Sequence, residues 1–436
     1  MTSTLTEKLN FLYALRRDYT ADRSFRAPYI DLLEKLGNPH HDLPPVIHVA
    51  GTNGKGSTIA FMRAILQAAG YRVHAYTSPH LLRPNERIVL AGKEISDALL
   101  EFLIDEGLKR CPDPQQPDLS FFEFFTACAF VAFAHSPADI LLLETGLGGR
   151  LDCTNIVRFP LLNIITTLSY DHTEILGPHI DNIAHEKAGI MKADAPCVIG
   201  HQIHQDVFTT LLQKAAETEI PVYTENNGWS YSGDGQDTPF SVSTATRQLD
   251  DLPAPRLHGA HQLSNAATAL AALMIQQRFE IPDSAFAKGL SAAVWPARLQ
   301  KIDTHMLPAD WELWLDGGHN DSAALVLADQ ARAWQESDGK PLHIITAMMG
   351  HKDAVAFAAP LASLVTSVIS VPVPDQEEYV LPPDILARVW TDAGAKVSQA
   401  LSSQPLPELL RSLSRSAPSG RVLITGSLHL AQMVGF

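Results

Sequence analysis

The chain has 436 residues, of which 46% are hydrophobic and 19% are charged, and its formal net charge is −15. This length exceeds one ordinary hydrophobic core, so we expect two domains, and the composition excludes a disordered chain. The acidic charge argues against a nucleic-acid-binding protein, which usually presents a basic face.

The cysteines and the N-terminal segment favour a cytoplasmic protein. The cysteines show no CxxC pairing, which suits reduced thiols better than disulfides or a zinc site; they stand at Cys111, Cys128, Cys153 and Cys197. Residues 1–20 contain charged side chains and lack the apolar core of a signal peptide, and the most apolar stretch, 121–135, is too short to span a bilayer. We therefore expect a cytoplasmic monomer with no membrane or nucleic-acid partner.

The first part of the chain alternates short apolar runs with helical patterns, which is typical of a mostly parallel sheet covered by helices. The pattern predicts a helix over 57–69, ended by Gly70, a strand–helix–strand unit within 197–225 and a long helix over 261–279. Residues 226–256 are rich in Gly, Ser, Asp and Thr and predict a small antiparallel excursion at a domain edge. Strands are predicted over 46–50, 73–77, 140–143 and 161–168.

A second alternating series begins near Trp311. It predicts a strand that runs into the glycines 317 and 318, a helix over 321–334, and further strands over 343–349, 365–373 and 422–425. The domain boundary is expected near residues 296–303. The sequence thus predicts an α/β protein with a P-loop-type, mostly parallel domain over 1–297 and a smaller Rossmann-like α/β domain over 298–436.

Residues 46–58, VIHVAGTNGKGST, read as a strand, a glycine loop with one lysine, and a helix. This arrangement places backbone N–H groups and a helix N-terminus around phosphate groups. The loop departs from the common phosphate-loop motif, because Gly56 separates Lys55 from Ser57 and Val49 stands five residues before Gly54. It predicts nucleotide binding through a variant loop; a simple glycine turn is the alternative.

Two more strand ends carry candidate residues. The apolar run 140–143 ends at Glu144, a carboxylate suited to Mg²⁺ beside a triphosphate, although a turn-capping acid would look the same. Asp171 and His172 follow another apolar run, where they could bind metal or phosphate, but a lone histidine is more often a structural hydrogen-bonding group. Taken alone, Lys187 is an ordinary lysine of an amphipathic helix.

Eight motifs then give a specific resemblance. GTNGKGST, TSPHL, ETGLGGRLDCTN, SYDHTEILG, HEKAGI, HQLSNAATAL, WPAR and DGGHN occur in the order expected of the folate-adding branch of the Mur ligase family. The chain resembles the folylpolyglutamate synthases, with dihydrofolate synthase activity as well, and the resemblance runs from about residue 32 to the end. It implies an enzyme that uses ATP and Mg²⁺ to join a carboxylate to glutamate.

The resemblance assigns roles by position. It implies contacts with the ATP phosphates for Gly54, Lys55, Gly56 and Ser57, and further nucleotide contacts for Asn265, Arg298 and Asp316. It implies Mg²⁺ ligation by Ser78, Glu144 and His172, carbamylation of Lys187, and a site for the pterin-bearing substrate at Glu123, Phe124, Leu151 and Asp152. Lys55, Lys187 and His172 are the expected catalytic residues.

The chain departs from the family pattern at a few places. Ala297 replaces the usual glycine of the Pro-x-Arg turn, Gly318 and Asp321 replace alanine and proline, and Cys153 stands where a small residue is common. The aromatic segment SFFEFFT, 120–126, differs from what is expected near a pterin pocket and leaves the pterin preference open. None of these departures falls on a phosphate or metal position.

The implied reaction transfers the γ-phosphoryl group of ATP to a carboxylate, and the glutamate amine then attacks the acyl phosphate. Closure of the second domain would exclude water. The alternatives are a folylpolyglutamate synthase without dihydrofolate synthase activity, a Mur-type ligase for a cell-wall precursor, a catalytically dead ATP-binding module, which would require the loss of a metal or phosphate residue although none is missing, and a phosphotransferase or GTPase. The last shares only the loop and gives no reason for a second domain with DGGHN.

Overall fold

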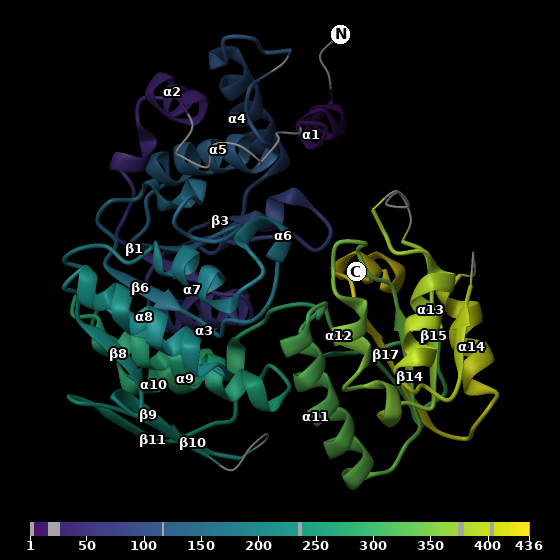
Figure 1. Ribbon diagram of the computed structural model, residues 1–436. Helices are drawn as coiled ribbons and strands as arrows, with labels where there is room; N and C mark the ends of the chain where they lie inside the picture. Colours follow the sequence, from purple (N-terminus) through teal and green to yellow (C-terminus); the bar gives the residue numbers. More distant parts are fainter. Residues whose placement is uncertain are drawn as a thin grey trace. The chain divides into compact units, whose positions relative to one another are not determined.

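The computed structural model describes residues 4–15, 27–115, 117–233, 238–373, 379–401 and 405–435. The chain divides into two compact units (Figure 1). The first comprises Met1–Leu168, Thr173–Pro255 and Ser264–Ala293, and the second comprises Ser169–His172, Arg256–Leu263 and Val294–Phe436. Each unit is built of helices around a sheet, so the predicted α/β class is confirmed; the division at residue 297 stays a prediction.

The first unit is built on a sheet with strand order β11-β10-β9-β8-β7-β6-β1-β5-β2-β3-β4. The strands from β9 to β2 in this order are parallel. Every residue of the four central strands is buried, as expected for parallel strands covered on both faces. These parallel strands are β1 (Val46–Ala50), β2 (Val73–Tyr76), β5 (Ile140–Glu144), β6 (Leu162–Ile165), β7 (Cys197–Ile199), β8 (Val222–Glu225) and β9 (Gly228–Ser232).

Antiparallel strands finish both edges of this sheet. β3 (Ile88–Leu90) and β4 (Lys93–Glu94) follow β2 at one edge. β10 (Phe240–Thr244) and β11 (Gln248–Leu252) pair in antiparallel fashion beyond β9 at the other. The antiparallel strands predicted within 226–256 are therefore confirmed.

Helices cover this sheet, and the hydrophobic side chains between helices and strands form clusters of buried residues. One cluster contains the aromatic side chains of α5, among them Phe124 and Phe130, together with residues of α2 and α4. Another packs α7 and α8 against β6 and β7. The helices are α1 (Leu5–Tyr13), α2 (Ala27–Lys35), α3 (Lys55–Ala68), α4 (Asp97–Arg110), α5 (Phe121–His135), α6 (Thr173–Leu176), α7 (Ile180–Ala188), α8 (Gln205–Glu217), α9 (Ala260–Ile275) and α10 (Asp283–Ala292), with short 3-10 turns η1 (Pro39–His41), η2 (Pro84–Arg87) and η3 (Cys153–Ile156).

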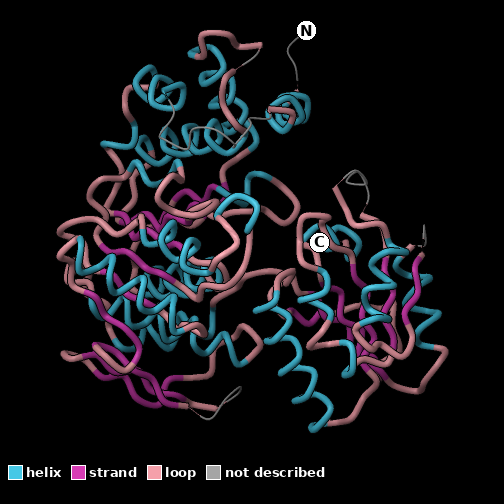
Figure 2. Tube along the Cα trace, viewed as in Figure 1, coloured by secondary structure: helices cyan, strands magenta, loops and turns pink. Residues whose placement is uncertain are grey.

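The second unit has a sheet of order β12-β13-β17-β14-β15-β16, in which β12 is antiparallel to β13 and the other pairs are parallel. Figure 2 shows the strands of this unit in magenta and its helices in cyan. Its core packs Trp390 and Phe357 between helices and sheet. Its strands are β12 (Gln300–Ile302), β13 (Trp311–Leu315), β14 (Leu342–Thr346), β15 (Ser367–Ser370), β16 (Ser398–Ala400) and β17 (Gly420–Thr425), and its helices are α11 (Asp321–Ser337), α12 (Ala354–Ala358), α13 (Pro383–Asp392) and α14 (Leu406–Ser414), with 3-10 turns η4 (Ala362–Leu364) and η5 (Leu428–Val434).

A charged network supports one end of this second sheet. The Arg421 side chain is only 4% exposed, and its Nε atom lies 2.7 Å from Glu312 Oε2. Trp314 donates its indole N–H to Glu312 over 3.1 Å, and Lys301 lies 2.9 Å from Glu312 Oε1. Burial alone would raise the pKa of Glu312, but the hydrogen bonds from Lys301, Arg421 and Trp314 outweigh it and lower the pKa to about 2.

Replacing Glu312 with glutamine is expected to destabilise the second unit by about 2 kcal/mol at pH 7, the scale of hydrogen bonds to a charged group. The folded pKa lies below the ordinary value of 4.5, so this stabilisation is complete above pH 4.5 and is lost as the pH falls toward 2. Urea unfolding followed by tryptophan fluorescence at pH 7 and pH 3 measures the difference between the two proteins. The exposed Glu336→Gln is the control, and a Glu312→Gln penalty that is equal at both pH values would contradict the assignment.

Candidate active site

The carboxyl ends of four neighbouring strands of the first unit meet at one edge of its sheet. These strands lie side by side in the order β6-β1-β5-β2. The loop after each strand either carries a predicted site residue or contacts a loop that does. Ligands of open parallel sheets bind at this edge, outside the carboxyl ends of the strands. The structure therefore brings together the loops that contain Gly54, Lys55, Ser78 and Glu144.

Residues 51–54 connect β1 to α3 as a tight loop. Gly54 precedes the helix with a φ of 88°, and a Cβ at this position would lie 2.3 Å from Asn265 Oδ1, so glycine is required by conformation and by space. A Cβ on Gly51 would lie 1.8 Å from Thr166 Oγ1. Asn265 is thus placed against the loop, as a nucleotide contact requires.

Helix α3 begins at Lys55, so Lys55, Gly56 and Ser57 form its first turn. The N–H groups of a first helical turn have no acceptor within the helix and favour an anion. The loop ahead of the helix is fixed by Thr52 and Asn53, whose N–H groups donate to Thr167 O over 3.0 and 3.1 Å. The predicted helix over 57–69 starts two residues earlier than expected because Gly54 supplies the N-cap.

Lys55 and Glu144 form the charged centre of this site. Lys55 Nζ lies 3.8 Å from Glu144 Oε1 and donates to the carbonyl oxygens of Gly51 and Thr52 over 3.0 and 3.2 Å. Glu144 is 2% exposed, and its Oε2 accepts the N–H of Ser78 over 3.0 Å. The glycine loop over residues 51–54 is called the phosphate-type loop from here on. A buried carboxylate beside a serine and this loop is a donor set that fits Mg²⁺.

Lys187 reaches the same loop from the last turn of α7. It is 6% exposed, and its Nζ atom donates to the carbonyl oxygen of Gly51 over 2.8 Å. Lys187 therefore is not a surface lysine, and both its amino group and that of Lys55 lie at Gly51. Its carbamylation stays a prediction.

The residues expected to hold the pterin-bearing substrate have structural contacts of their own. Glu123 closes a capping box at the start of α5, where Ser120 N and Oγ both donate to Glu123 Oε2 over 2.8 Å. Phe124 is fully buried and lies against Gly107 of α4. The pattern Ser-x-x-Glu before an apolar run indicates such a box and is the sequence signal for this role of Glu123.

Leu151 and Asp152 lie in the loop between β5 and η3. Leu151 is partly buried, whereas Asp152 is 5% exposed and accepts hydrogen bonds from Gly146 N and Leu147 N, both over 2.9 Å. Burial raises the pKa of Asp152 although these bonds oppose the shift. Substrate binding by Glu123, Phe124, Leu151 and Asp152 stays a prediction.

In the second unit, Asp316 organises the segment that carries Arg298. Asp316 is 6% exposed and accepts hydrogen bonds from Leu299 N and Gly318 N, each over 2.7 Å. Ala297 has a φ of 54°, so the turn keeps a backbone conformation that favours glycine, at a cost of about 1 kcal/mol for an L-residue. Arg298 donates from Nη1 to Ala297 O over 2.9 Å.

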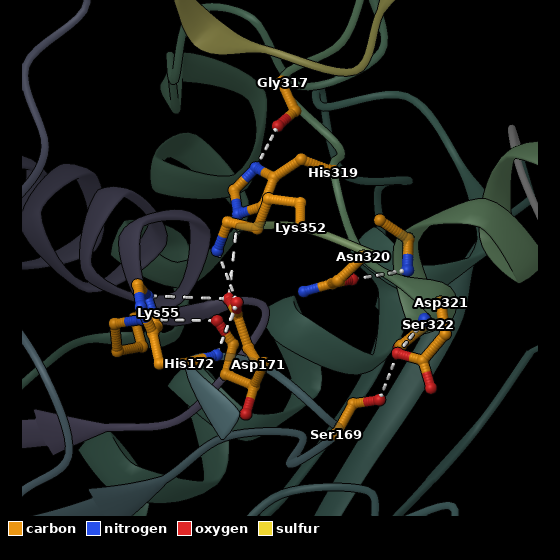
Figure 3. A network of polar contacts seen from close by, with 12 residues as sticks. Lys55, Ser169, Asp171, His172, Gly317, His319, Asn320, Asp321, Ser322 and Lys352 are labelled. Atoms are coloured by element: carbon orange, nitrogen blue, oxygen red, sulfur yellow. Dashed lines mark hydrogen bonds and ion pairs between the residues drawn. The ribbon is translucent and has the colours of Figure 1, made fainter. Parts of the chain in front are cut away.

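His172 belongs to a second cluster, which Figure 3 shows from close by. Within the second unit, Asp171 forms an ion pair with Lys352, and its Oδ2 lies 3.7 Å from His319 Nε2 and 3.8 Å from His172 Nε2. Burial would raise the pKa of Asp171, but hydrogen bonding to His319 and the nearby charges hold it far below its usual range.

In the sequence, Asp171 is only a possible ligand, and no pattern indicates Lys352 and His319 as its partners. β14 ends at Thr346 and Lys352 lies further along the loop to α12, so its pairing with Asp171 has no signal in the strand pattern. The metal-binding role of His172 stays a prediction, since Ser78 and Glu144 are the two predicted ligands that the first unit itself unites.

The chain is similar to known proteins over most of its length. No protein-family model matches it. The dihydrofolate synthase/folylpolyglutamate synthase of Bacillus subtilis is 32% identical, over 91% of this chain and 91% of the Bacillus protein. The chain belongs to the dihydrofolate synthase/folylpolyglutamate synthase family. The predicted family and the prediction of an ATP-dependent ligase are thereby confirmed.

Two further relatives extend this family assignment. A probable bifunctional folylpolyglutamate synthase/dihydropteroate synthase of Halobacterium salinarum is 33% identical over 97% of this chain, which spans only 50% of that protein. A crystal structure of a bifunctional folylpolyglutamate synthase/dihydrofolate synthase is 31% identical, with a TM-score of 0.82 and coverage of 99% of this chain and 97% of its own. That structure holds Mn, AMPPNP and L-glutamate.

Among the described residues of our chain, no helix is both long and apolar enough to cross a bilayer.

Proposed function

We propose that this chain joins L-glutamate through an amide bond to dihydropteroate, to folates, or to both, at the expense of ATP. The observation that carries the proposal is the buried Glu144 carboxylate, with Lys55 and Ser78 beside it, next to the glycine loop at the carboxyl edge of the first sheet. The named activities of the family members match this chemistry. A folylpolyglutamate synthase without dihydrofolate synthase activity is the second candidate, because the aromatic segment 120–126 leaves the pterin preference open.

The proposed reaction has two steps. A carboxylate oxygen of the acceptor attacks the γ-phosphorus of ATP, the bond to ADP breaks, and an acyl phosphate forms. The amine of glutamate then attacks the acyl carbon, the amide forms, and phosphate leaves with the oxygen that came from the carboxylate, while the nitrogen loses a proton. Lys55 and the N–H groups of the first turn of α3 neutralise the charge on the transferred phosphoryl group.

The divalent cation would be held by Glu144, with Ser78 and His172 as the other proposed ligands, and would neutralise charge on the phosphates. A carbamate on Lys187 would turn its cation at Gly51 into an anion able to support that metal. Asn265, Arg298 and Asp316 are the proposed nucleotide contacts, and Glu123, Phe124, Leu151 and Asp152 the proposed pterin-site residues. The proposal rests on the family resemblance together with the positions of these residues within each unit.

A panel of acceptors tests the proposed function. Phosphate release and product mass would be measured with ATP, Mg²⁺ and glutamate, together with dihydropteroate, tetrahydrofolate or a UDP-linked cell-wall precursor. The proposal predicts a product heavier by one glutamyl group with dihydropteroate, tetrahydrofolate or both. Product with the UDP-linked acceptor alone, or a phosphorylated product without amide, would refute it in favour of another Mur-type ligase or a phosphotransferase.

We further propose that the protein works as a cytoplasmic monomer. The four cysteines are buried and form no disulfide, which suits a reducing compartment. Gel filtration with light scattering measures the mass in solution, and a mass of two chains at micromolar concentration would contradict the monomer.

A further inference from the structure

A chain of buried hydrogen bonds runs from strand β1 to the loop that follows Glu144. His48 of β1 is fully buried, and its Nε2 atom lies 2.9 Å from Thr154 Oγ1 in η3. The Thr154 hydroxyl donates to Asp152 Oδ1 over 2.5 Å, and Thr154 N donates to the same oxygen over 2.9 Å. Asp152 Oδ2 accepts Gly146 N and Leu147 N. We call this chain the His48 relay.

The direction of each bond in the His48 relay follows from its chemistry. Asp152 accepts two bonds on each carboxylate oxygen, so the Thr154 hydroxyl gives its proton to Asp152 and must accept from His48. Burial, with a smaller contribution from Lys192, lowers the pKa of His48 to about 3, so the imidazole is neutral and carries its one proton on Nε2. The relay therefore has one defined arrangement.

The His48 relay connects parts of the proposed active site. His48 stands three residues before Gly51 of the phosphate-type loop, and its register partner on β5 is Leu143, the residue before Glu144. Gly146 and Leu147, whose N–H groups donate to Asp152, lie in the loop just after Glu144 and are separated from it only by Thr145. The relay thus fixes the loop 146–152 against the strand that leads to the phosphate-type loop.

Packing alone gives no reason for a histidine at this position. The adjacent β5 strand places a leucine, Leu143, beside it in the same row of the sheet. The Nδ1 atom of His48 is buried and has no hydrogen-bond partner among the described residues, which costs stability that an aliphatic side chain would not. What His48 supplies instead is the single N–H donor at the start of the relay.

We propose that His48 is a positioning residue for the ligation, acting through Thr154 and Asp152 to set the loop 146–152 for the pterin-bearing substrate. This inference rests on the proposed function and on the pterin role proposed for Leu151 and Asp152. His48 itself acts only through Thr154, so it contributes no group to the reacting atoms.

Two matched pairs of variants test the His48 relay. His48→Leu removes the donor, while His48→Gln places an amide N–H near the position of Nε2; Thr154→Val removes the hydroxyl at equal size, while Thr154→Ser keeps it. Removal of the donor or the hydroxyl is expected to raise KM for the pterin-bearing acceptor about 10- to 100-fold, the usual effect of losing a residue that orients a site. KM for ATP should stay within about twofold, and the Gln and Ser variants should lie within about threefold of wild type.

The outcomes separate this inference from the proposed function. A wild-type protein that ligates no pterin acceptor refutes the function itself. If the wild type is active, the positioning role is overturned by any of three results. His48→Leu and Thr154→Val leave KM for the acceptor unchanged, they raise KM for ATP equally, or His48→Gln and Thr154→Ser do not restore KM for the acceptor. Thermal unfolding checks that each variant is folded. If His48→Leu is not folded, Thr154→Val alone decides whether the positioning role holds. The double variant His48→Leu/Thr154→Val should be no worse than either single one, since both cut the same relay.

Discussion

Replacing Lys55 with alanine is expected to lower kcat of ligation about 10³-fold, the effect of removing a group that stabilises transition-state charge. Lys55 Nζ lies 3.8 Å from the buried Glu144 carboxylate and donates to the carbonyl oxygens of Gly51 and Thr52, so the variant removes a positive charge from the loop where the phosphates are proposed to bind. The measurement is the steady-state rate of phosphate release with saturating ATP, glutamate and acceptor.

The matched control for this variant is Lys93→Ala. Lys93 is an exposed lysine of the same unit, in β4 at the far edge of the sheet, and its removal should leave the rate unchanged. Circular dichroism should show both variants folded. A Lys55→Ala protein whose kcat lies within about tenfold of the wild-type value would show that Lys55 does not stabilise the transition state. It would therefore contradict the site as described.

Replacing Glu144 with glutamine is expected to abolish Mg²⁺-dependent turnover to a similar extent, about 10²- to 10³-fold. Glutamine keeps the size of the side chain and an oxygen for the Ser78 N–H, but it removes the negative charge that a Mg²⁺ ion requires. The rate would be measured as a function of Mg²⁺ concentration, and the concentration for half-maximal rate should rise at least about tenfold.

Glu34→Gln, an exposed glutamate of α2, serves as the control for Glu144→Gln and should follow the wild-type Mg²⁺ curve. Unfolding measurements guard against a structural explanation, since Glu144 is buried beside Lys55. An unchanged Mg²⁺ dependence in a folded Glu144→Gln protein would show that the metal is bound elsewhere.

Much of the fold could be predicted because the central parallel strands are short and mostly apolar. β1 is observed where it was predicted, and the helix and strands of the 197–225 unit lie within that range. The predicted strand over 161–168 is shorter, since β6 ends at Ile165 and Thr167 instead accepts the N–H groups of Thr52 and Asn53. Helix α5 has no visible period, because its apolar residues surround it on all sides.

The candidate site was predictable where a polar residue ends an apolar strand, as Glu144 ends β5. A site residue was harder to predict from the sequence where its role depends on backbone groups or on partners that are distant in the chain. Asp152 organises its loop through N–H groups that no residue pattern reveals. The pairing of Asp171 with Lys352 joins residues 181 positions apart, and their proximity exists only in the folded second unit.

The central claim is that ATP activates the carboxylate of the acceptor, and isotope transfer tests it most directly. Dihydropteroate, or the folate that the panel identifies as acceptor, would be labelled with ¹⁸O in the reacting carboxylate, and the released phosphate would be analysed by mass spectrometry after ligation to glutamate. An acyl phosphate requires that each phosphate released carry one oxygen from that carboxylate. Phosphate that contains no ¹⁸O while the amide forms would contradict the account.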